Sequence, residues 1–111
     1  MLSKKKSASS KRTTLPRSVD FAKAFPKDWQ RLERSGRYDM HRLKEAMTLL
    51  ISNDGLLAPE WRDHLLKGDW VGHRECHIGG DFLLIYKLAE TQPSELVVFV
   101  RAGTHAELFE G

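Results

Sequence analysis

The fold is decided by residues 74–88, which read RECHIGGDFLLIYKL. Two β-type runs, residues 70–78 and 81–88, lie on either side of Gly79-Gly80, a pair typical of a tight hairpin. Residues 82–86 are apolar at every position, which indicates a central strand that is covered on both faces. A third run, residues 96–101, follows a turn at residues 91–94, so we expect an antiparallel meander.

A first helix is expected before this sheet. It follows Ser18, a residue suited to an N-cap, and apolar residues recur at helical spacing as far as Gly36, which suits a C-terminal stop. Pro26 either kinks this helix or lies in the first turn of a helix that begins later. Residues 13–15 are expected to form a short edge strand, which Pro16 ends because proline cannot donate to a ladder.

A second helix begins after Asp39, another N-cap residue, and ends at residues 53–55, which read Asn-Asp-Gly. Its apolar face consists of Met40, Leu43, Met47 and Leu50, and we interpret this stripe as core. Helices followed by a run of strands predict an α+β fold.

The length and cysteine content limit the class of protein. A chain of 111 residues has room for one domain that folds around its own core. The single Cys76 excludes an intramolecular disulfide, which favours a reducing environment, and its apolar neighbours predict a small buried residue and not a nucleophile. The sequence has neither an apolar run long enough to span a bilayer nor a signal peptide, so we expect a cytoplasmic protein.

The positive charge is unevenly distributed. The formal net charge is +3, but residues 1–12 hold 5 of the 18 basic side chains and none of the 15 acidic ones. Residues 13–111 therefore carry a net charge of −2, so bulk charge is weak evidence that this part binds nucleic acid. We expect residues 1–12 to be a flexible basic tail and residues 13–111 to be the folded domain.

The end of the chain carries a capping box. Thr104 and Glu107 have the spacing at which each side chain accepts from the backbone amide of the other. A single helical turn is expected to start here, with His105 at its first position. The amide groups at such an end favour an anion such as phosphate, and they favour the neutral form of His105.

Three of the five histidines, His64, His77 and His105, lie in turns or at strand ends, whereas His41 and His73 are expected to be solvated or structural. Cleavage of RNA by its own 2′-hydroxyl needs a base, an acid and a cation for the charge that grows on phosphorus. Histidine suits both proton transfers near neutral pH, and an arginine can bind phosphate bidentately.

The candidate cation is Arg101, four residues before His105, so both can converge at one end of the third strand. Whether Asp81 joins them is left open, because one added turn residue in the hairpin would reverse the face on which His77 lies.

A metal site is the competing interpretation of these residues. The three histidines and Asp81 have the ligand types of a zinc or iron site, but no two histidines are four residues apart on a helix. We therefore expect no metal and no other cofactor.

Several segments of the sequence, taken in order, resemble those of the YafQ family of RelE-like toxins. These segments are residues 63–68 (DHLLKG), 74–78 (RECHI), 81–86 (DFLLIY) and 101–109 (RAGTHAELF). The resemblance covers residues 13–111 and implies a compact RelE-like microbial RNase fold, with two N-terminal helices on a small antiparallel sheet. It also implies an endoribonuclease that cleaves mRNA in the ribosomal A site and is neutralised by a cognate antitoxin protein.

The resemblance also implies which residues act. The catalytic positions are His64, His77, Asp81, Arg101 and His105, and the substrate-binding positions are Lys67, Arg74, Phe82 and Phe109. His77 and His105 would exchange protons with the 2′-hydroxyl and the leaving oxygen, Arg101 would stabilise the phosphorane, and His64 and Asp81 would orient the histidines. Phe82 stands where family members commonly have Trp, a change that keeps a ring face for base stacking.

Two other functions stay open from the sequence. One is a module of the same fold that binds RNA or the ribosome without cleaving, and the other is a metal-dependent hydrolase. An assay of mRNA cleavage in the presence of a chelator, and again after metal is restored, would distinguish all three.

Overall fold

The hairpin of β4 (Arg74–Gly79) and β5 (Phe82–Ala89) organises the sheet. It pairs His77 with Leu83 and Gly79 with Phe82, with an irregularity between His77 and Gly79. A plain two-residue turn would place His77 opposite Phe82, so the bulge decides the register that the sequence leaves open. His77 consequently shares a face of the sheet with Leu83 and not with Phe82.

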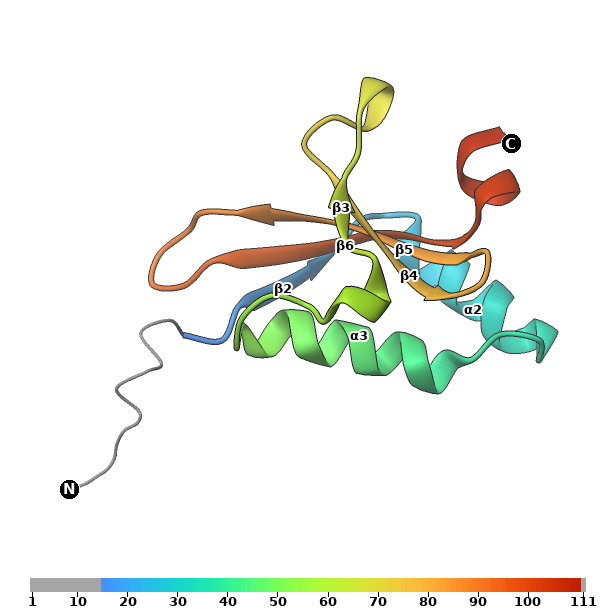
Figure 1. Ribbon diagram of the computed structural model, residues 1–111, viewed down its shortest axis with the longest axis horizontal. Helices are drawn as coiled ribbons and strands as arrows, with labels where there is room; N and C mark the ends of the chain where they lie inside the picture. Colours follow the sequence, from blue (N-terminus) through green and yellow to red (C-terminus); the bar gives the residue numbers. More distant parts are fainter. Residues whose placement is uncertain (1–14, 111) are drawn as a thin grey trace.

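The computed structural model describes residues 15–110, in which five strands form one sheet in the order β2-β6-β5-β4-β3 (Figure 1). The other strands are β2 (Ser18–Phe21), β3 (His64–Leu65) and β6 (Leu96–Thr104), and the helices are α2 (Phe25–Ser35) and α3 (Met40–Ser52). Three single turns complete the fold: η1 (Pro59–Trp61), η2 (Gly68–Trp70) and η3 (Ala106–Glu110). The expected tail, residues 1–12, lies outside the described residues.

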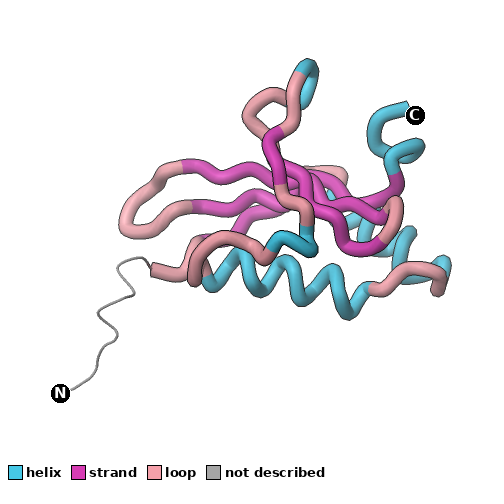
Figure 2. Tube along the Cα trace, in the orientation of Figure 1, coloured by secondary structure: helices cyan, strands magenta, loops and turns pink. Residues whose placement is uncertain are grey.

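The two faces of the sheet are covered differently. The main core fills the face toward α2 and α3 and includes Leu43, Leu84 and Phe99. A smaller cluster on the opposite face joins Leu83 and Ile85 of β5 to Leu108 of η3. In Figures 1 and 2 the two long helices lie on one side, and η3 and the segment after β3 lie on the other. The prediction of a central strand covered on both faces is confirmed.

The first helix begins later than its apolar spacing suggests. Ser18 is not an N-cap, because residues 18–21 form the exposed strand β2. Pro26 lies in the first turn of α2, as in the second of the two possibilities, and Gly36 ends the helix with a φ of 70°. Leu15, at the end of the expected edge strand, is described and lies outside any strand, while residues 13 and 14 lie outside the described part.

The second helix is as predicted. The side chain of Asp39 accepts a hydrogen bond from the Arg42 amide at 2.9 Å, and Asn53 ends the helix in a left-handed conformation. Leu43 and Leu50 are buried in the core, with Met40 and Met47 packed against it.

Two expectations about the sheet are wrong. The predicted antiparallel meander of β4, β5 and β6 is confirmed, but the sheet as a whole is mixed and not wholly antiparallel, because β2 pairs with β6 in parallel. The first β-type run starts at Arg74 and not at Trp70, since Trp70 closes the turn η2. The sequence contains no signal for β3, a two-residue strand that pairs with β4.

Across residues 15–110, each helix is too short or too polar to cross a bilayer.

The thiol of Cys76 is expected to be unreactive in the folded protein. Burial, together with the carboxylates of Asp63 and Glu75, raises the pKa of the thiol to about 12. Iodoacetamide at pH 8 should therefore leave Cys76 unmodified in native protein and alkylate it after denaturation, as measured by mass spectrometry. Rapid alkylation of the native protein would show that the thiol is exposed to solvent.

Candidate active site

The sheet register brings two histidines and a glutamate onto one face. His64 of β3 pairs directly with Glu75 of β4, and His77 lies two residues beyond Glu75 on the same strand. Since residues two apart on a strand share a face, all three side chains project from the sheet away from α2 and α3. Their partners on β5, Ile85 and Leu83, belong to the smaller apolar cluster on that face.

Glu75 is the centre of this group. Only 3% of the residue is exposed, and its Oε2 atom lies 3.3 Å from Nε2 of His64 and 3.3 Å from Nε2 of His77. A buried carboxylate is costly unless positive charge faces it. The opposite edge of the His64 ring is also engaged, because Nδ1 lies 2.8 Å from the carbonyl oxygen of Arg62. A carbonyl oxygen only accepts, so Nδ1 carries a proton, and Nε2 can donate to Glu75 only when the ring carries a second proton.

The same three residues could instead hold a metal ion. Their ligand atoms lie within 4.8 Å of one another, and two imidazoles with one carboxylate form a donor set typical of zinc or copper. The hydrogen bond from His64 Nδ1 to a backbone carbonyl is the usual outer contact of a histidine ligand. This trio includes Glu75, which the sequence interpretation overlooked, and does not include Asp81 or His105. The expectation that the protein needs no metal stays a prediction.

His105 is oriented by a second carboxylate. Its Nδ1 atom lies 2.6 Å from Oδ1 of Asp81, and its backbone amide donates to the same oxygen at 3.3 Å. The hydrogen bond from His105 lowers the pKa of Asp81, so this carboxylate is ionised at neutral pH and Nδ1 carries the shared proton. Nε2 of His105 therefore remains available for proton transfer. The centroid of the His105 ring lies 6.4 Å from that of the His77 ring.

The turn that carries His105 is built as predicted. The Glu107 amide donates to Oγ1 of Thr104 at 3.2 Å, and the Thr104 amide donates to Oε1 of Glu107 at 2.8 Å. Gly103 precedes this capping box because a Cβ there would lie 2.6 Å from Oε1 of Glu107 and 3.0 Å from the guanidinium of Arg31.

Aromatic rings border the histidines. Phe109, which is 38% exposed, lies 5.6 Å from the His105 ring and meets Trp70 edge-on at 5.7 Å. Trp70 in turn contacts His73 at 5.3 Å. Partly exposed aromatic rings beside these histidines suit the stacking of a nucleic-acid base. Phe109 was expected in the site, whereas Trp70 was not.

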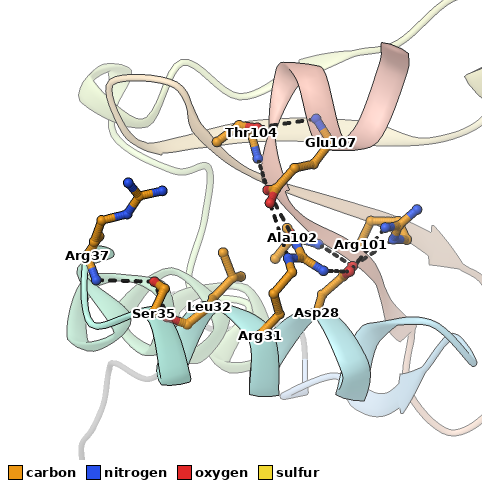
Figure 3. Close-up of polar contacts among 9 residues, drawn as sticks. All are labelled: Asp28, Arg31, Leu32, Ser35, Arg37, Arg101, Ala102, Thr104 and Glu107. Atoms are coloured by element: carbon orange, nitrogen blue, oxygen red, sulfur yellow. Dashed lines mark hydrogen bonds and ion pairs between the residues drawn. The ribbon is translucent and has the colours of Figure 1, made fainter. Parts of the chain in front are cut away.

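Arg101 is held by a buried carboxylate on α2 (Figure 3). Its Nε and Nη2 atoms donate to Asp28 at 2.6 and 3.1 Å, and Asp28 is 2% exposed. Burial raises the pKa of Asp28, but the hydrogen bonds from Arg101 and Arg31 outweigh this effect and hold it below its usual value. The side edge of the Arg101 guanidinium is therefore occupied, and its Nη1–Nη2 end remains for an anion.

The remaining predicted positions are spread over the domain. Lys67 is exposed in the segment between β3 and η2. The expected contact of Phe82 with a base is not supported, because Phe82 is 5% exposed and packs against Tyr38 on the core face. Arg74 also lies apart from the histidines. It directly precedes Glu75 on β4, so its side chain projects from the opposite face of the sheet, where it binds Asp63 at 2.9 Å.

Besides Trp70, the sequence interpretation missed two acidic residues, Glu75 and Asp28. Glu75 lies two residues before His77 in a predicted strand, and that spacing would have placed both side chains on one face. No comparable signal marks Asp28, because its partner Arg101 is 73 residues away in the chain.

Comparisons with known proteins agree on one family. The family model described as the bacterial toxin of type II toxin-antitoxin systems, YafQ, matches residues 17–110. The mRNA interferase toxin YafQ of Escherichia coli K12 is 40% identical over 95 residues, covering 86% of this chain and 98% of the relative.

Two solved structures share the fold. The toxin chain in the crystal structure of the E. coli DinJ-YafQ toxin-antitoxin complex has a TM-score of 0.74 at 40% identity, covering 86% of this chain and 99% of that one. A metal-bound toxin from Helicobacter pylori has a TM-score of 0.71 at 34% identity, covering 84% and 99%.

The pairing of Asp81 with His105 can be tested by titration. Replacing His105 with Gln should raise the pKa of Asp81 toward its ordinary value, because the hydrogen bond from His105 is the main cause of the lowered value. In the wild-type protein the pair should persist at neutral pH and be lost only as the pH falls through the lowered pKa of Asp81.

The measurement is a carboxyl ¹³C NMR titration of both proteins. His41→Gln is the matched control and should leave the Asp81 titration unchanged. An Asp81 titration that is the same in His105→Gln and the wild type would contradict the pairing.

Proposed function

Because the chain belongs to the YafQ family of bacterial toxins of type II toxin-antitoxin systems, we propose that it is an endoribonuclease that cleaves mRNA on the ribosome. The observation that carries this proposal is the pair of histidines, His77 and His105, with ring centroids 6.4 Å apart. Each is held by its own carboxylate, Glu75 or Asp81. Two oriented imidazoles at this separation can both contact one phosphodiester group.

The reaction needs two proton transfers. One histidine takes the proton of the 2′-hydroxyl as its oxygen attacks phosphorus, and a phosphorane forms. The bond from phosphorus to the 5′-oxygen then breaks, and the other histidine gives a proton to that oxygen. The products are a 2′,3′-cyclic phosphate and a 5′-hydroxyl, so atoms and charge balance without a redox partner. The free end of the Arg101 guanidinium would stabilise the phosphorane.

The carboxylates decide which nitrogen atoms react. Asp81 accepts from Nδ1 of His105 and so directs Nε2 toward the substrate, as the aspartate of a hydrolase triad directs its histidine. His64 acts on His77 through Glu75, to which both rings are joined. Phe109 and Trp70 would stack on a base beside the cleaved bond, and Lys67 would contact the RNA backbone.

A cognate antitoxin is the expected protein partner, since the E. coli relative forms a complex with its antitoxin DinJ. We place the antitoxin on the helices and the sheet edge. There an apolar groove of about 370 Å³ is lined by Phe21, Phe25, Trp29 and Met47 among others, and Phe21 is exposed at the edge strand β2. A toxin that acts on ribosomes would work in the cytoplasm.

A metal-dependent hydrolase is the second candidate function. The specific observation in its favour is the trio His64, Glu75 and His77, together with the metal-bound relative from H. pylori. A bound ion there would supply Lewis-acid chemistry in place of an imidazolium. A non-catalytic module that binds the ribosome is the third candidate.

One assay separates these functions. The protein is incubated with programmed ribosomes in the presence of a chelator, and the mRNA ends are analysed. We expect cleavage with cyclic or 3′-phosphate ends. Cleavage only after metal is restored would support the second candidate, and no cleavage in either condition would support the third.

The same assay tests the catalytic role proposed for His105. His105→Ala should slow cleavage by about 10²-fold or more if His105 acts in acid–base catalysis. His41→Ala, which replaces a histidine on the exposed side of α3, is the matched control and should cleave at the wild-type rate. A near wild-type rate for His105→Ala would remove the role assigned to it.

The basic tail is expected to strengthen binding to ribosomal RNA. Residues 1–12 carry a charge of +5 and lie outside the described residues. Deleting them should weaken ribosome binding and flatten its dependence on salt, because each phosphate contact releases counterions. Sedimentation with ribosomes at several salt concentrations measures both effects, and unchanged binding would exclude this role for the tail.

A further inference from the structure

The end of β6 extends beyond its neighbour β2. The parallel pairing stops at Phe21 and Phe99, so within residues 15–110 no strand lies on that side of the following part of β6. Two side chains of α2 take the place of a strand at Ala102. Asp28 accepts from the Ala102 amide at 3.1 Å, and Arg31 donates to the Ala102 carbonyl at 3.2 Å. The amide and carbonyl of Ala102, which a sheet edge would leave unpaired, are therefore satisfied by side chains of one helix.

Between them, the same two side chains contact both Arg101 and Glu107 (Figure 3). Asp28 holds Arg101 directly, and it also accepts from Nη1 of Arg31 at 2.8 Å. Nε of Arg31 pairs with Oε2 of Glu107 at 3.2 Å, and Glu107 caps the turn that carries His105. A single buried carboxylate thus joins the candidate phosphate-binding arginine to the turn of a candidate catalytic histidine.

Asp28 also separates two like charges. Arg31 and Arg101 both bind its carboxylate, and each would repel the other without it, as the effect of Arg31 on the pKa of Arg101 indicates. With Asp28 ionised, the guanidinium of Arg101 is fixed by its side edge, and its Nη1–Nη2 end has one orientation. Catalysis is sensitive to displacements of about 1 Å in such groups.

We propose that Asp28 is a positioning residue for the cleavage reaction, acting through Arg101 and, by way of Arg31, on the turn that holds His105. This inference rests on the proposed function. Asp28 touches neither substrate nor reacting atoms, and its place on α2, in the core between helix and sheet, would otherwise give it a role in stability alone.

The test is the change Asp28→Asn, which keeps the size of the side chain and removes its charge. The single-turnover rate of mRNA cleavage on programmed ribosomes should fall about 10- to 100-fold, with the half-saturating ribosome concentration unchanged. Asp20→Asn, at an exposed carboxylate on β2, is the matched control and should retain the wild-type rate. A wild-type rate in Asp28→Asn, or a loss confined to ribosome binding, would overturn the proposal.

A double-mutant cycle separates positioning from stability. In the Arg101→Ala background, Asp28→Asn should slow cleavage much less than in the wild type, because the direct contact through which Asp28 acts is gone and only the route through Arg31 remains. The same cost in both backgrounds would overturn the proposal, since a purely structural defect slows every variant alike.

If Asp28→Asn is unfolded by circular dichroism, Arg31→Met replaces it in the assay. This change leaves the contact between Asp28 and Arg101 and breaks the link to Glu107, so cleavage should slow with ribosome binding unchanged. A wild-type rate in folded Arg31→Met would then overturn the proposal. An inactive wild-type protein would overturn the proposed function, and this inference with it.

Discussion

The pairing of β4 with β5 is the constraint on which the rest of the structure depends. Side chains alternate along a strand, so the bulge between His77 and Gly79 sends Glu75 and His77 to one face, and Cys76 and Ile78 to the other. A slip of one residue would exchange the two sets, burying charged groups under the helices and exposing apolar ones. The hydrophobic core thereby enforces the geometry of the site, although none of its side chains takes part in the chemistry.

The two buried carboxylates on either face of the sheet differ in how they are neutralised. Asp28 accepts from two guanidinium groups and a backbone amide, and those groups carry or donate protons at any physiological pH. Glu75 faces two imidazoles, which are positive only when protonated. The first arrangement is fixed, whereas the second changes with protons or with a bound cation. Under the proposed function, Asp28 would hold Arg101 in place at any physiological pH, whereas the charge around Glu75 would change with the protonation of its two histidines.

Internal pairing also explains why net charge is a poor guide to the function of this domain. Arg31 and Arg101 are bound by Asp28, and Arg74 is bound by Asp63. These arginines orient other groups and present only part of their hydrogen-bonding capacity outward. Under the proposed function, recognition of RNA by the described domain would rely on the aromatic side chains of Trp70 and Phe109 beside the histidines, and on local cations such as Lys67.

The sequence by itself determined the α+β class, the second helix with its Asp39 cap, the apolar central strand and the capping box at Thr104, because each depends on residues close together in the chain. It also pointed to His64, His77, Asp81 and His105, which the structure gathers around one face. Only the tertiary structure decided that β2 is a parallel edge strand and that Phe82 and Arg74 lie on the other face of the sheet from the histidines. It also decided that Glu75 lies between His64 and His77 and that Asp28 binds Arg101. Those features depend on strand register and on contacts between residues up to 78 positions apart, which local periodicity does not encode.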